Sequence, residues 1–493
     1  MGLPDSMDFL NGSVPGSLIK PLPWGQVTPA SAFVKIARGP YSFLLESTRG
    51  TESTGRYSFV GTDPFLVLRA KGTRIETLEH GIHRVFEGDP LEVLQRYLRD
   101  LAIPSPADIP PFYGGAVGLF SYDLARRIEV LPSLALDDLN CPDLAVMFVD
   151  TLIAFDHQEK RAVLVFTPAG DRIATTDRTT LMKEGLAKID RLEKDLWRPS
   201  AGAAHREGPA HFARPVSNMT KEHYVSMVRR CKDYIAAGDI YQANLSQRFS
   251  VPFHGDPWML YRILSEINPS PFAAFLQLDD LCLISASPER LIRLNKGLLE
   301  TRPIAGTRPR GDSPEEDSGM ICELLSNEKE CAEHLMLVDL ERNDLGKVCR
   351  YGSVHVDEFM VTERYSHVIH IVSNIRGDIL PEKTALDAFR AVFPGGTVTG
   401  VPKIRCLQII EELEPVTRGP YTGSLGYVSF GGEMDMNIII RTFVIKNGRA
   451  HIQVGGGIVA DSNPDREYEE TLFKAEALLK ALNRLPEKNA DLR

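Results

Sequence analysis

The sequence predicts an α/β fold of the α+β type, in which antiparallel hairpins and helices follow one another irregularly. One observation is a pair of β-rich runs, Met436–Lys446 and Ala450–Val454, that an Asn-Gly dipeptide joins as in a tight hairpin. Another is a clear helix start at Asn463, a capping residue followed by proline at the first helical position. Strands and helices do not alternate in the regular way that is typical of a parallel sheet.

Composition and charge exclude several classes of protein. The chain has 493 residues, of which 43% are hydrophobic and 25% charged, as in an ordinary globular protein. Its formal charge of −10 argues against nucleic acid as the main partner, because phosphate binding requires a basic face. It has no apolar run of the ~18 residues that a membrane span requires. We therefore expect no membrane partner. The seven scattered cysteines contain no C-x-x-C pair, which is typical of a reducing compartment, so we expect a cytoplasmic protein.

The stretch 199–219 is rich in Pro, Ala and Gly and has no apolar periodicity, which predicts a linker. It divides the chain into an N-terminal region, 1–198, and a larger region, 220–484, followed by a short tail, 485–493.

Elements follow from local patterns on both sides of this linker. In the first region we expect strands at Tyr41–Leu45, Phe65–Arg69, Leu144–Phe155 and Arg161–Phe166, and helices at Pro90–Leu101 and Thr180–Leu196. In the second region, Thr220 caps a predicted helix that reaches Ala237. The apolar stripe predicted for the last helix consists of Tyr468, Leu472, Ala475, Leu479 and Leu482.

Two pairs of acidic residues suggest a metal site. Glu330 and Glu333 are three residues apart on one probable helix, and Glu467 and Glu470 are three apart on the last helix. Residues three apart share a helix face, so each helix offers two neighbouring carboxylates. An oxygen-only site between the two helices suits Mg²⁺. The alternative is that all four are solvated surface acids.

Two further segments are candidates for binding an anion. Gly455–Gly457 follows the predicted strand that ends at Val454, and its backbone N–H groups can approach a carboxylate closely. The alternative is an ordinary loop. Arg302, Arg308 and Arg310 lie in a loop punctuated by Pro and Gly, which either faces an anionic ligand or is a solvated basic turn.

Taken together, the motifs resemble the chorismate-utilising family that includes anthranilate synthase component I and aminodeoxychorismate synthase component I. The resemblance extends from about residue 28 to residue 484, and implies a large β-sandwich flanked by helices, as in anthranilate synthase component I. Its most specific segments are GRYSFVGTDP (55–64), GDIYQANLSQRF (238–249), ISASPERL (284–291), RPIAGTRPRG (302–311), ECAEHLMLVDLERNDLG (330–346), PGGTVTGVPK (394–403) and GGGIVADSNPDREYEETLFKA (455–475).

The resemblance implies a role for each acidic pair and for the residues around them. Glu333 and Glu470 would bind Mg²⁺, with Glu330 and Glu467 supporting it through water, and the ion would neutralise the ring carboxylate of chorismate. The residues implied to hold the rest of the substrate are Tyr421, Arg441, Gly456 and Gly457 at the enolpyruvyl carboxylate, Lys474 at a further carboxylate contact, and Gly306, Thr307, His370 and Thr397 in the pocket wall.

The resemblance also implies the catalytic chemistry. Glu289 occupies the position of the family's general acid and would protonate the departing 4-hydroxyl, because hydroxide is a poor leaving group. Gln242 stands where water-using relatives have a lysine base, and a neutral amide fits ammonia as the nucleophile. The chain has no class I glutaminase motif, so a separate glutaminase subunit would supply the ammonia, and free ammonia at high pH could replace that subunit.

The residues point to two products. The segments YQANLSQRF and NPSPFAAF resemble the aminodeoxychorismate branch, which aminates C4 for p-aminobenzoate and folate synthesis, and we favour this branch. Ala305 points to the alternative, anthranilate for tryptophan synthesis, because well-studied enzymes of the first branch have a lysine there that adds to C2.

A possible tryptophan site and a non-enzymatic alternative complete the expectations. The residues that resemble the family's tryptophan site are Leu45, Glu46 and Ser47, with Asn268, Pro269, Ser270, Pro271 and Phe272. The alternative for the first of these is a plain core strand. An inactive paralogue that binds tryptophan as a regulator would be of another functional class, but retention of the acidic residues, of Arg441 and of Lys474 argues against it.

Overall fold

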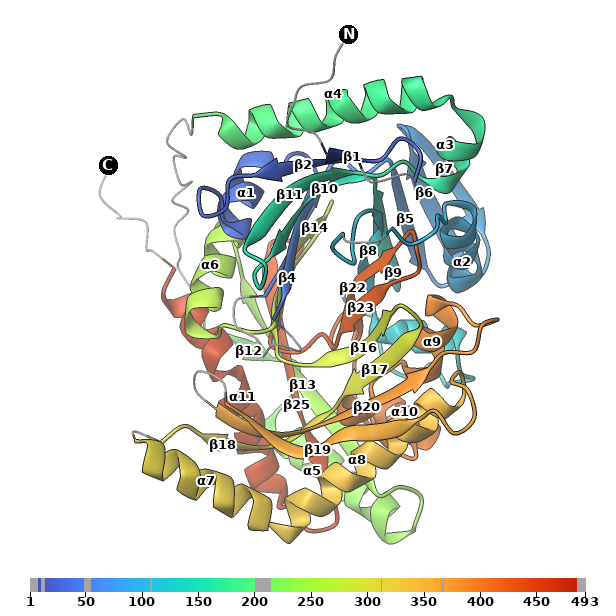
Figure 1. The fold of residues 1–493 in the computed structure, drawn as a ribbon. Helices are drawn as coiled ribbons and strands as arrows, with labels where there is room; N and C mark the ends of the chain where they lie inside the picture. Colours follow the sequence, from blue (N-terminus) through green and yellow to red (C-terminus); the bar gives the residue numbers. More distant parts are fainter. Residues whose placement is uncertain are drawn as a thin grey trace, which may run out of the picture.

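Two antiparallel sheets dominate the computed structural model, which describes residues 8–9, 14–47, 55–106, 109–199, 214–311, 313–364 and 368–485 (Figure 1). Within these residues the first sheet has thirteen strands. Their order across the sheet is β1 (Asp8–Phe9), β2 (Leu18–Leu22), β11 (Arg161–Phe166), β10 (Thr151–Asp156), β4 (Tyr57–Thr62), β3 (Tyr41–Glu46), β14 (Phe272–Leu278), β15 (Leu281–Ser287), β24 (Thr442–Lys446), β25 (Arg449–Ile458), β13 (Gln242–Pro252) and β12 (Val216–Ser217), with β21 (Gly400–Val401) also paired to β13.

The second sheet has twelve strands in the described part of the chain. Their order is β18 (Ile304–Pro309), β20 (Val368–Asp378), β17 (Leu298–Arg302), β16 (Arg290–Asn295), β23 (Met434–Asn437), β22 (Ser424–Ser429), β8 (Gly115–Phe120), β9 (Leu144–Val149), β5 (Leu66–Lys71), β6 (Arg74–Glu79) and β7 (Ile82–Glu87), with β19 (His355–Arg364) also paired to β20.

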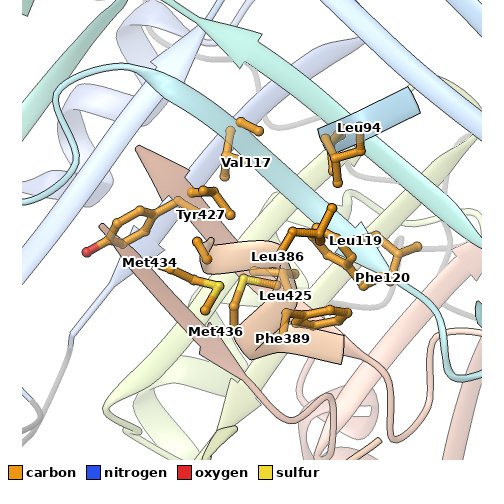
Figure 2. Close-up of a cluster of buried hydrophobic side chains, with 14 of the residues drawn as sticks. Leu94, Val117, Leu119, Phe120, Leu386, Phe389, Leu425, Tyr427, Met434 and Met436 are labelled. Carbon is orange, nitrogen blue, oxygen red and sulfur yellow. The ribbon is translucent and has the colours of Figure 1, made fainter. Parts of the chain in front are cut away.

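The main core lies between the two sheets, because successive side chains of a strand point to opposite faces. In β3, Phe43 belongs to this inner core and Leu44 to the outer one, and Phe59 and Val60 of β4 divide in the same way. Figure 2 shows buried side chains on both faces of the second sheet: Tyr427 and Val117 lie on one face, and Met436 lies on the other, on the side of Phe389.

Helices cover the outer faces. The first sheet is covered by α1 (Pro29–Ile36), α4 (Arg178–Trp197), α6 (Pro257–Ile267) and α11 (Pro464–Asn483), and the second by α2 (Pro90–Asp100) and α9 (Ala385–Val392). The remaining helical segments are α3 (Gly170–Thr175), α5 (Lys221–Ala236), α7 (Pro314–Ser326), α8 (Glu328–Gly346), α10 (Lys403–Leu413) and the 3₁₀ segments η1 (Tyr122–Arg127) and η2 (Gly396–Val398). In Figure 1, α7 and α8 lie at the bottom of the view, beside β18, β19 and β20. None of the described helices is both long and apolar enough to cross a membrane.

Several predicted elements are confirmed to within a few residues. The Thr220 hydroxyl accepts a hydrogen bond from the His223 amide at the start of α5, and Asn463 caps α11. Asn447 and Gly448 have φ of 50° and 69°, as the predicted hairpin turn between β24 and β25 requires.

Other predicted elements are wrong in detail. The run Leu144–Phe155 is two strands, β9 and β10, which lie in different sheets. The run Met436–Lys446 also divides between the sheets, as β23 and β24. The predicted loop around Arg302 and Arg308 consists of two strands, β17 and β18, which pair with opposite edges of β20. In α11 the buried stripe is rotated, so that Leu472 is 38% exposed.

Both sheets are continuous across the two sequence regions. In the first sheet β14 pairs with β3, and in the second β22 pairs with β8, so strands from either side of residues 199–219 are direct neighbours. The predicted α+β architecture is confirmed.

Candidate active site

Residues far apart in the sequence meet at the C-terminal end of β25. Gly455, Gly456 and Gly457 were expected in a loop after the strand, but they belong to β25 and pair with β13. On the other side of β25, β24 pairs only as far as Ile452. The glycines therefore leave one backbone edge of the strand open among the described residues, which is compatible with the expected approach of a carboxylate.

Each of these glycines makes room for a functional side chain. A β-carbon at Gly457 would lie 2.3 Å from Nε2 of Gln242, and one at Gly455 would lie 2.9 Å from the hydroxyl of Tyr421. The Lys474 ammonium donates a hydrogen bond to the Gly455 carbonyl at 3.0 Å. The structure thus brings these five residues together as expected.

The four acidic residues of the two pairs also converge. A β-carbon at Gly456 would lie 3.4 Å from Oε2 of Glu467 and 3.7 Å from Oε1 of Glu470. Burial raises the pKa of Glu333, on α8, and the charges of Glu330 and of the two α11 carboxylates raise it further. The two pairs therefore lie close enough for their charges to interact, although Glu470 is itself exposed.

Neighbouring cations hold three of the four carboxylates. Arg308 Nη2 lies 2.8 Å from Glu330 Oε1, Lys474 Nζ lies 2.7 Å from Glu470 Oε1, and Lys329 Nζ lies 4.0 Å from Glu333 Oε1. Glu330 Oε2 is buried and accepts no hydrogen bond from the described residues.

This arrangement fits a hard divalent cation in its donor chemistry, because carboxylate oxygens are the ligands that Mg²⁺ prefers. As the side chains stand, no three His, Cys, Asp or Glu residues in the described ranges are close enough together to hold a metal ion. The carboxylates face their cations and are not gathered around one point.

Glu289 lies between β15 and β16 and is only 5% exposed. Burial raises the pKa of its carboxyl to about 7. The Thr397 hydroxyl, the Ile304 amide and the Arg441 charge act in the opposite direction, and the Ile304 N–H lies 3.5 Å from Oε1. A carboxyl whose pKa is raised this far keeps a proton near neutral pH more readily than an exposed glutamate, as a general acid requires.

Strand β18 forms the wall of the site beside Glu289. It contains Ala305, Gly306 and Thr307, and it pairs with β20, where Ile371 lies opposite Ala305 and His370 opposite Thr307. The side chain of Thr307 is outside the described part of the structure.

His370 connects this wall to Arg441. Its Nδ1 lies 3.2 Å from the Gly306 carbonyl. Burial and the Arg441 charge lower the pKa of His370 to about 4, so the ring is neutral at pH 7. Arg441 itself has a φ of 51°, in the turn between β23 and β24.

Two buried charged residues near the site escaped sequence analysis. Glu341 is 9% exposed, and burial raises its pKa to about 8, with the charge of Glu289 adding to the shift. Its position on the buried face of α8, four residues after Leu337, is a helical signal that could have revealed it. Arg418 forms a buried ion pair with Glu414, and its guanidinium lies over the Tyr421 ring.

The three arginines of the RPIAGTRPRG segment all face protein carboxylates. Arg302 pairs with Glu363, Arg308 with Glu330, and Arg310 with Asp317. Arg302 and Arg308 are therefore largely buried ion-pair residues, whereas Arg310 is exposed.

The residues of the possible tryptophan site lie at a separate cavity of about 200 Å³. Leu45, Glu46, Pro271 and Phe272 line this cavity, together with Arg290, Tyr427 and Asp435, whereas Ser47, Asn268, Pro269 and Ser270 do not. The Tyr261 hydroxyl donates a hydrogen bond to the Glu46 carboxylate at 2.6 Å, and burial raises the pKa of Glu46.

Comparison with known proteins agrees with this architecture. The sequence model of the family described as chorismate binding enzyme matches residues 41–480. Aminodeoxychorismate synthase component 1 of Bacillus subtilis (strain 168) is 44% identical over 470 residues, which cover 94% of this chain and 96% of that protein. Anthranilate synthase component 1 of Thermus thermophilus is 46% identical over 465 residues, which cover 92% and 95%. The crystal structure of anthranilate synthase component I from Streptococcus pneumoniae TIGR4 aligns with a TM-score of 0.75 at 34% identity and covers 87% of this chain and 93% of that one.

Proposed function

The chain belongs to the chorismate-binding enzyme family, and we propose that it replaces the 4-hydroxyl of chorismate with ammonia, giving 4-amino-4-deoxychorismate for p-aminobenzoate and folate synthesis. It is a chorismate-utilising enzyme of the anthranilate synthase and aminodeoxychorismate synthase type. The observation that carries the proposed amination is the buried Glu289 carboxyl, whose pKa of about 7 suits an acid that must be protonated to act.

In the proposed reaction Glu289 gives its proton to the departing hydroxyl, so that water leaves in place of hydroxide. Neutral His370 forms part of the adjacent wall and adds no second positive charge beside Arg441. Arg441 and Tyr421, with the open edge of β25 at Gly456 and Gly457, hold the enolpyruvyl carboxylate.

Four carboxylates would hold Mg²⁺ in the proposed complex. Glu333 and Glu470 would bind it, and Glu330 and Glu467 would support it through water. The ion, when bound, would neutralise the ring carboxylate of chorismate and fix the position of the ring. Lys474 would leave its ion pair with Glu470 and form a new ion pair with a carboxylate of the substrate.

Gln242 supports ammonia as the nucleophile. Its amide lies against Gly457, and its buried Oε1 accepts no hydrogen bond in the structure. An amide cannot take a proton from water, but its free oxygen can accept a hydrogen bond from ammonia. We propose that a separate class I glutaminase subunit delivers the ammonia.

Asn244 supports C4 as the position of amination. Its buried Oδ1 faces the backbone at Gly455, at 2.7 Å from a β-carbon placed there, and accepts no hydrogen bond. The resemblance associates this polar residue with the aminodeoxychorismate branch, whereas anthranilate synthases usually have an apolar residue there.

Ala305 favours the second candidate function, formation of anthranilate. Its methyl group leaves C2 of a bound ring open to ammonia, because no amine at this position can add there first. Relatives of both kinds have more than 40% identity to the chain, so overall similarity does not separate the two products.

Product identity tests the proposal. The purified chain is incubated with chorismate, Mg²⁺ and ammonium at alkaline pH, and products are separated by chromatography and identified by mass. We expect 4-amino-4-deoxychorismate, which a lyase then converts to p-aminobenzoate. Anthranilate, recognised by its fluorescence, would establish the second candidate, and no consumption of chorismate by folded protein would leave only the binding role.

The same assay tests the cavity at Glu46. We propose that it holds tryptophan, with the indole against Leu45 and Phe272 and the amino group at the Glu46 carboxylate. Turnover is measured at increasing concentrations of tryptophan, and binding of tryptophan is measured by calorimetric titration. Together the two measurements distinguish feedback inhibition from binding that leaves turnover unchanged. A chain that binds no tryptophan by calorimetry would exclude this role.

A further inference from the structure

Arg308, a residue of strand β18, contacts carboxylates on two neighbouring helices. Its Nη2 lies 2.8 Å from Glu330 Oε1 on α8, and its Nε donates a hydrogen bond to Glu323 Oε1 on α7 at 3.1 Å. The side chains of Arg308 and Glu330 are only 18% and 20% exposed. One guanidinium thus joins β18 to both helices through their carboxylates.

The second oxygen of Glu330 is also fixed by β18. Gly306 has a φ of 62°, and a β-carbon there would lie 2.6 Å from Glu330 Oε2. The Glu330 carboxylate therefore lies against the strand, with one oxygen on Arg308 and the other buried beside Gly306 without a hydrogen bond.

The same six-residue strand reaches the proposed acid. The Ile304 N–H lies 3.5 Å from Glu289 Oε1, and the Gly306 carbonyl lies 3.2 Å from His370 Nδ1. Arg308 and the contact with Glu289 at Ile304 thus lie four residues apart on one strand.

We propose that Arg308 is the resident counter-ion of the acidic cluster and is exchanged for a divalent cation. A buried carboxylate is costly without a partner, so Glu330 takes Arg308 when no cation is present. A divalent cation at the four carboxylates competes with the guanidinium for Glu330, because two positive groups so close repel each other. Arg308 is in this account a positioning residue, and its release lets β18 adjust beside Glu289.

The inference rests on the metal site of the proposed function, but it also predicts how removal of Arg308 changes the affinity for the metal. If Arg308 only supports the fold, its removal weakens metal binding or leaves it unchanged. If Arg308 competes with the cation, its removal strengthens metal binding. The sign of the effect separates the two.

Metal affinity without substrate is the direct test. Free Mn²⁺ is measured by electron paramagnetic resonance during titration of the wild-type chain, Arg308→Gln and Arg310→Gln. We expect Arg308→Gln to bind Mn²⁺ about tenfold more tightly, as loss of one neighbouring positive charge implies. Arg310→Gln is the matched control, because Arg310 follows on the same segment but pairs with Asp317, and its affinity should equal that of the wild type. An unchanged or weaker affinity of Arg308→Gln would overturn the exchange.

Glu333→Gln separates failure of the exchange from failure of the metal site. If Glu333→Gln binds Mn²⁺ as well as the wild type does, or if neither binds it, the proposed site is wrong and the exchange falls with it. If Glu333→Gln binds at least tenfold more weakly while Arg308→Gln matches the wild type, only the exchange is wrong.

Thermal unfolding gives a second readout that does not depend on activity. Without Arg308, the Glu330 carboxylate loses the cation that holds it in the described part of the chain, so in chelator Arg308→Gln should melt at a lower temperature than the wild type and recover more than the wild type on addition of Mn²⁺. Should Arg308→Gln not fold, Arg308→Met replaces it, because it keeps a long unbranched side chain but removes the positive charge. Its Mn²⁺ affinity should exceed that of the wild type, and equality would contradict the proposal.

Discussion

Glu289 illustrates how a single residue acquires its chemistry from burial. An exposed glutamate is ionised at pH 7 and cannot donate a proton, but this carboxyl is 5% exposed and its pKa is raised to about 7. The nearby charge of Arg441 opposes the shift without cancelling it. The sequence predicted the residue through its motif, but not its protonation, because the apolar surroundings come from separate strands.

Replacement of Glu289 by Gln should reduce turnover by about 10²–10⁴-fold, the usual contribution of general acid catalysis. The wild-type turnover number should fall as pH rises through about 7, because the carboxyl loses its proton there. The measurement is turnover against pH at a constant concentration of free ammonia, since ammonia itself increases with pH. An unchanged rate in the variant, or the same pH limb in both proteins, would remove Glu289 from the acid role.

The same substitution should stabilise the fold at high pH. Between the ordinary pKa of 4.5 and the folded value of about 7, the folded chain keeps a proton that the unfolded chain releases, so stability falls as pH rises through this window. Gln stays neutral and avoids the loss, which amounts to about 3 kcal/mol at pH 8. Urea denaturation of both proteins at pH 5 and pH 8 measures it, and a variant that is less stable at pH 8 would contradict the account.

At the scale of elements, helical periodicity predicted the acidic pairs but not their partners. Residues three apart on one helix share a face, so the sequence alone predicts that Glu330 lies beside Glu333 and that Glu467 lies beside Glu470. Arg308 lies on a strand that was expected to be a loop, and its contact with Glu330 depends on how that strand packs against α8. Glycine composition similarly suggested a loop at residues 455–457, where close approach of side chains to a strand is the actual reason for glycine.

The end of α10 depends on one buried arginine. Arg418 donates hydrogen bonds to both oxygens of Glu414, at 2.7 and 3.0 Å, and to the carbonyls of Asn244 and Val398. It thereby ties α10 to β13 and η2, directly behind Tyr421. Nothing in the local sequence distinguishes this arginine from an exposed one, because its partners are brought by three different elements.

Replacement of Arg418 by Met should lower the free energy of unfolding by about 3–5 kcal/mol, because Glu414 would remain buried without its cation. Arg405→Gln is the control, since Arg405 and Asp239 form an exposed pair, at 38% for each side chain, and should contribute less than about 1 kcal/mol. Urea denaturation at pH 7 compares the variants. Equal losses for both would show that the Arg418 network contributes no more than a surface ion pair.

At the scale of the whole molecule, the sequence predicted a linker between two regions but not that both sheets contain strands from each region. Most of the predicted linker, residues 200–213, lies outside the described residues, and its described end contains strand β12, whereas the two sheets cross this boundary at β3–β14 and β8–β22. Strand pairing between residues more than 200 positions apart leaves no local pattern, so neither the order of the strands nor the division of residues 144–155 between sheets could be predicted.

This continuity makes the two regions interdependent, although every residue placed in the active site comes from the second. A chain cut after residue 206 should give fragments that aggregate when expressed singly, because β14 and β22 lose their neighbours and expose unpaired edges. Expressed together, the fragments should copurify through an affinity tag on one of them and consume chorismate. Fragment 207–493 purified alone, monomeric by gel filtration and active, would show that the first region is an accessory to the sandwich and not half of it. Failure of the coexpressed fragments to associate would point to a requirement for the covalent link itself, because the strand pairs would then be too weak to assemble the sheets from separate chains.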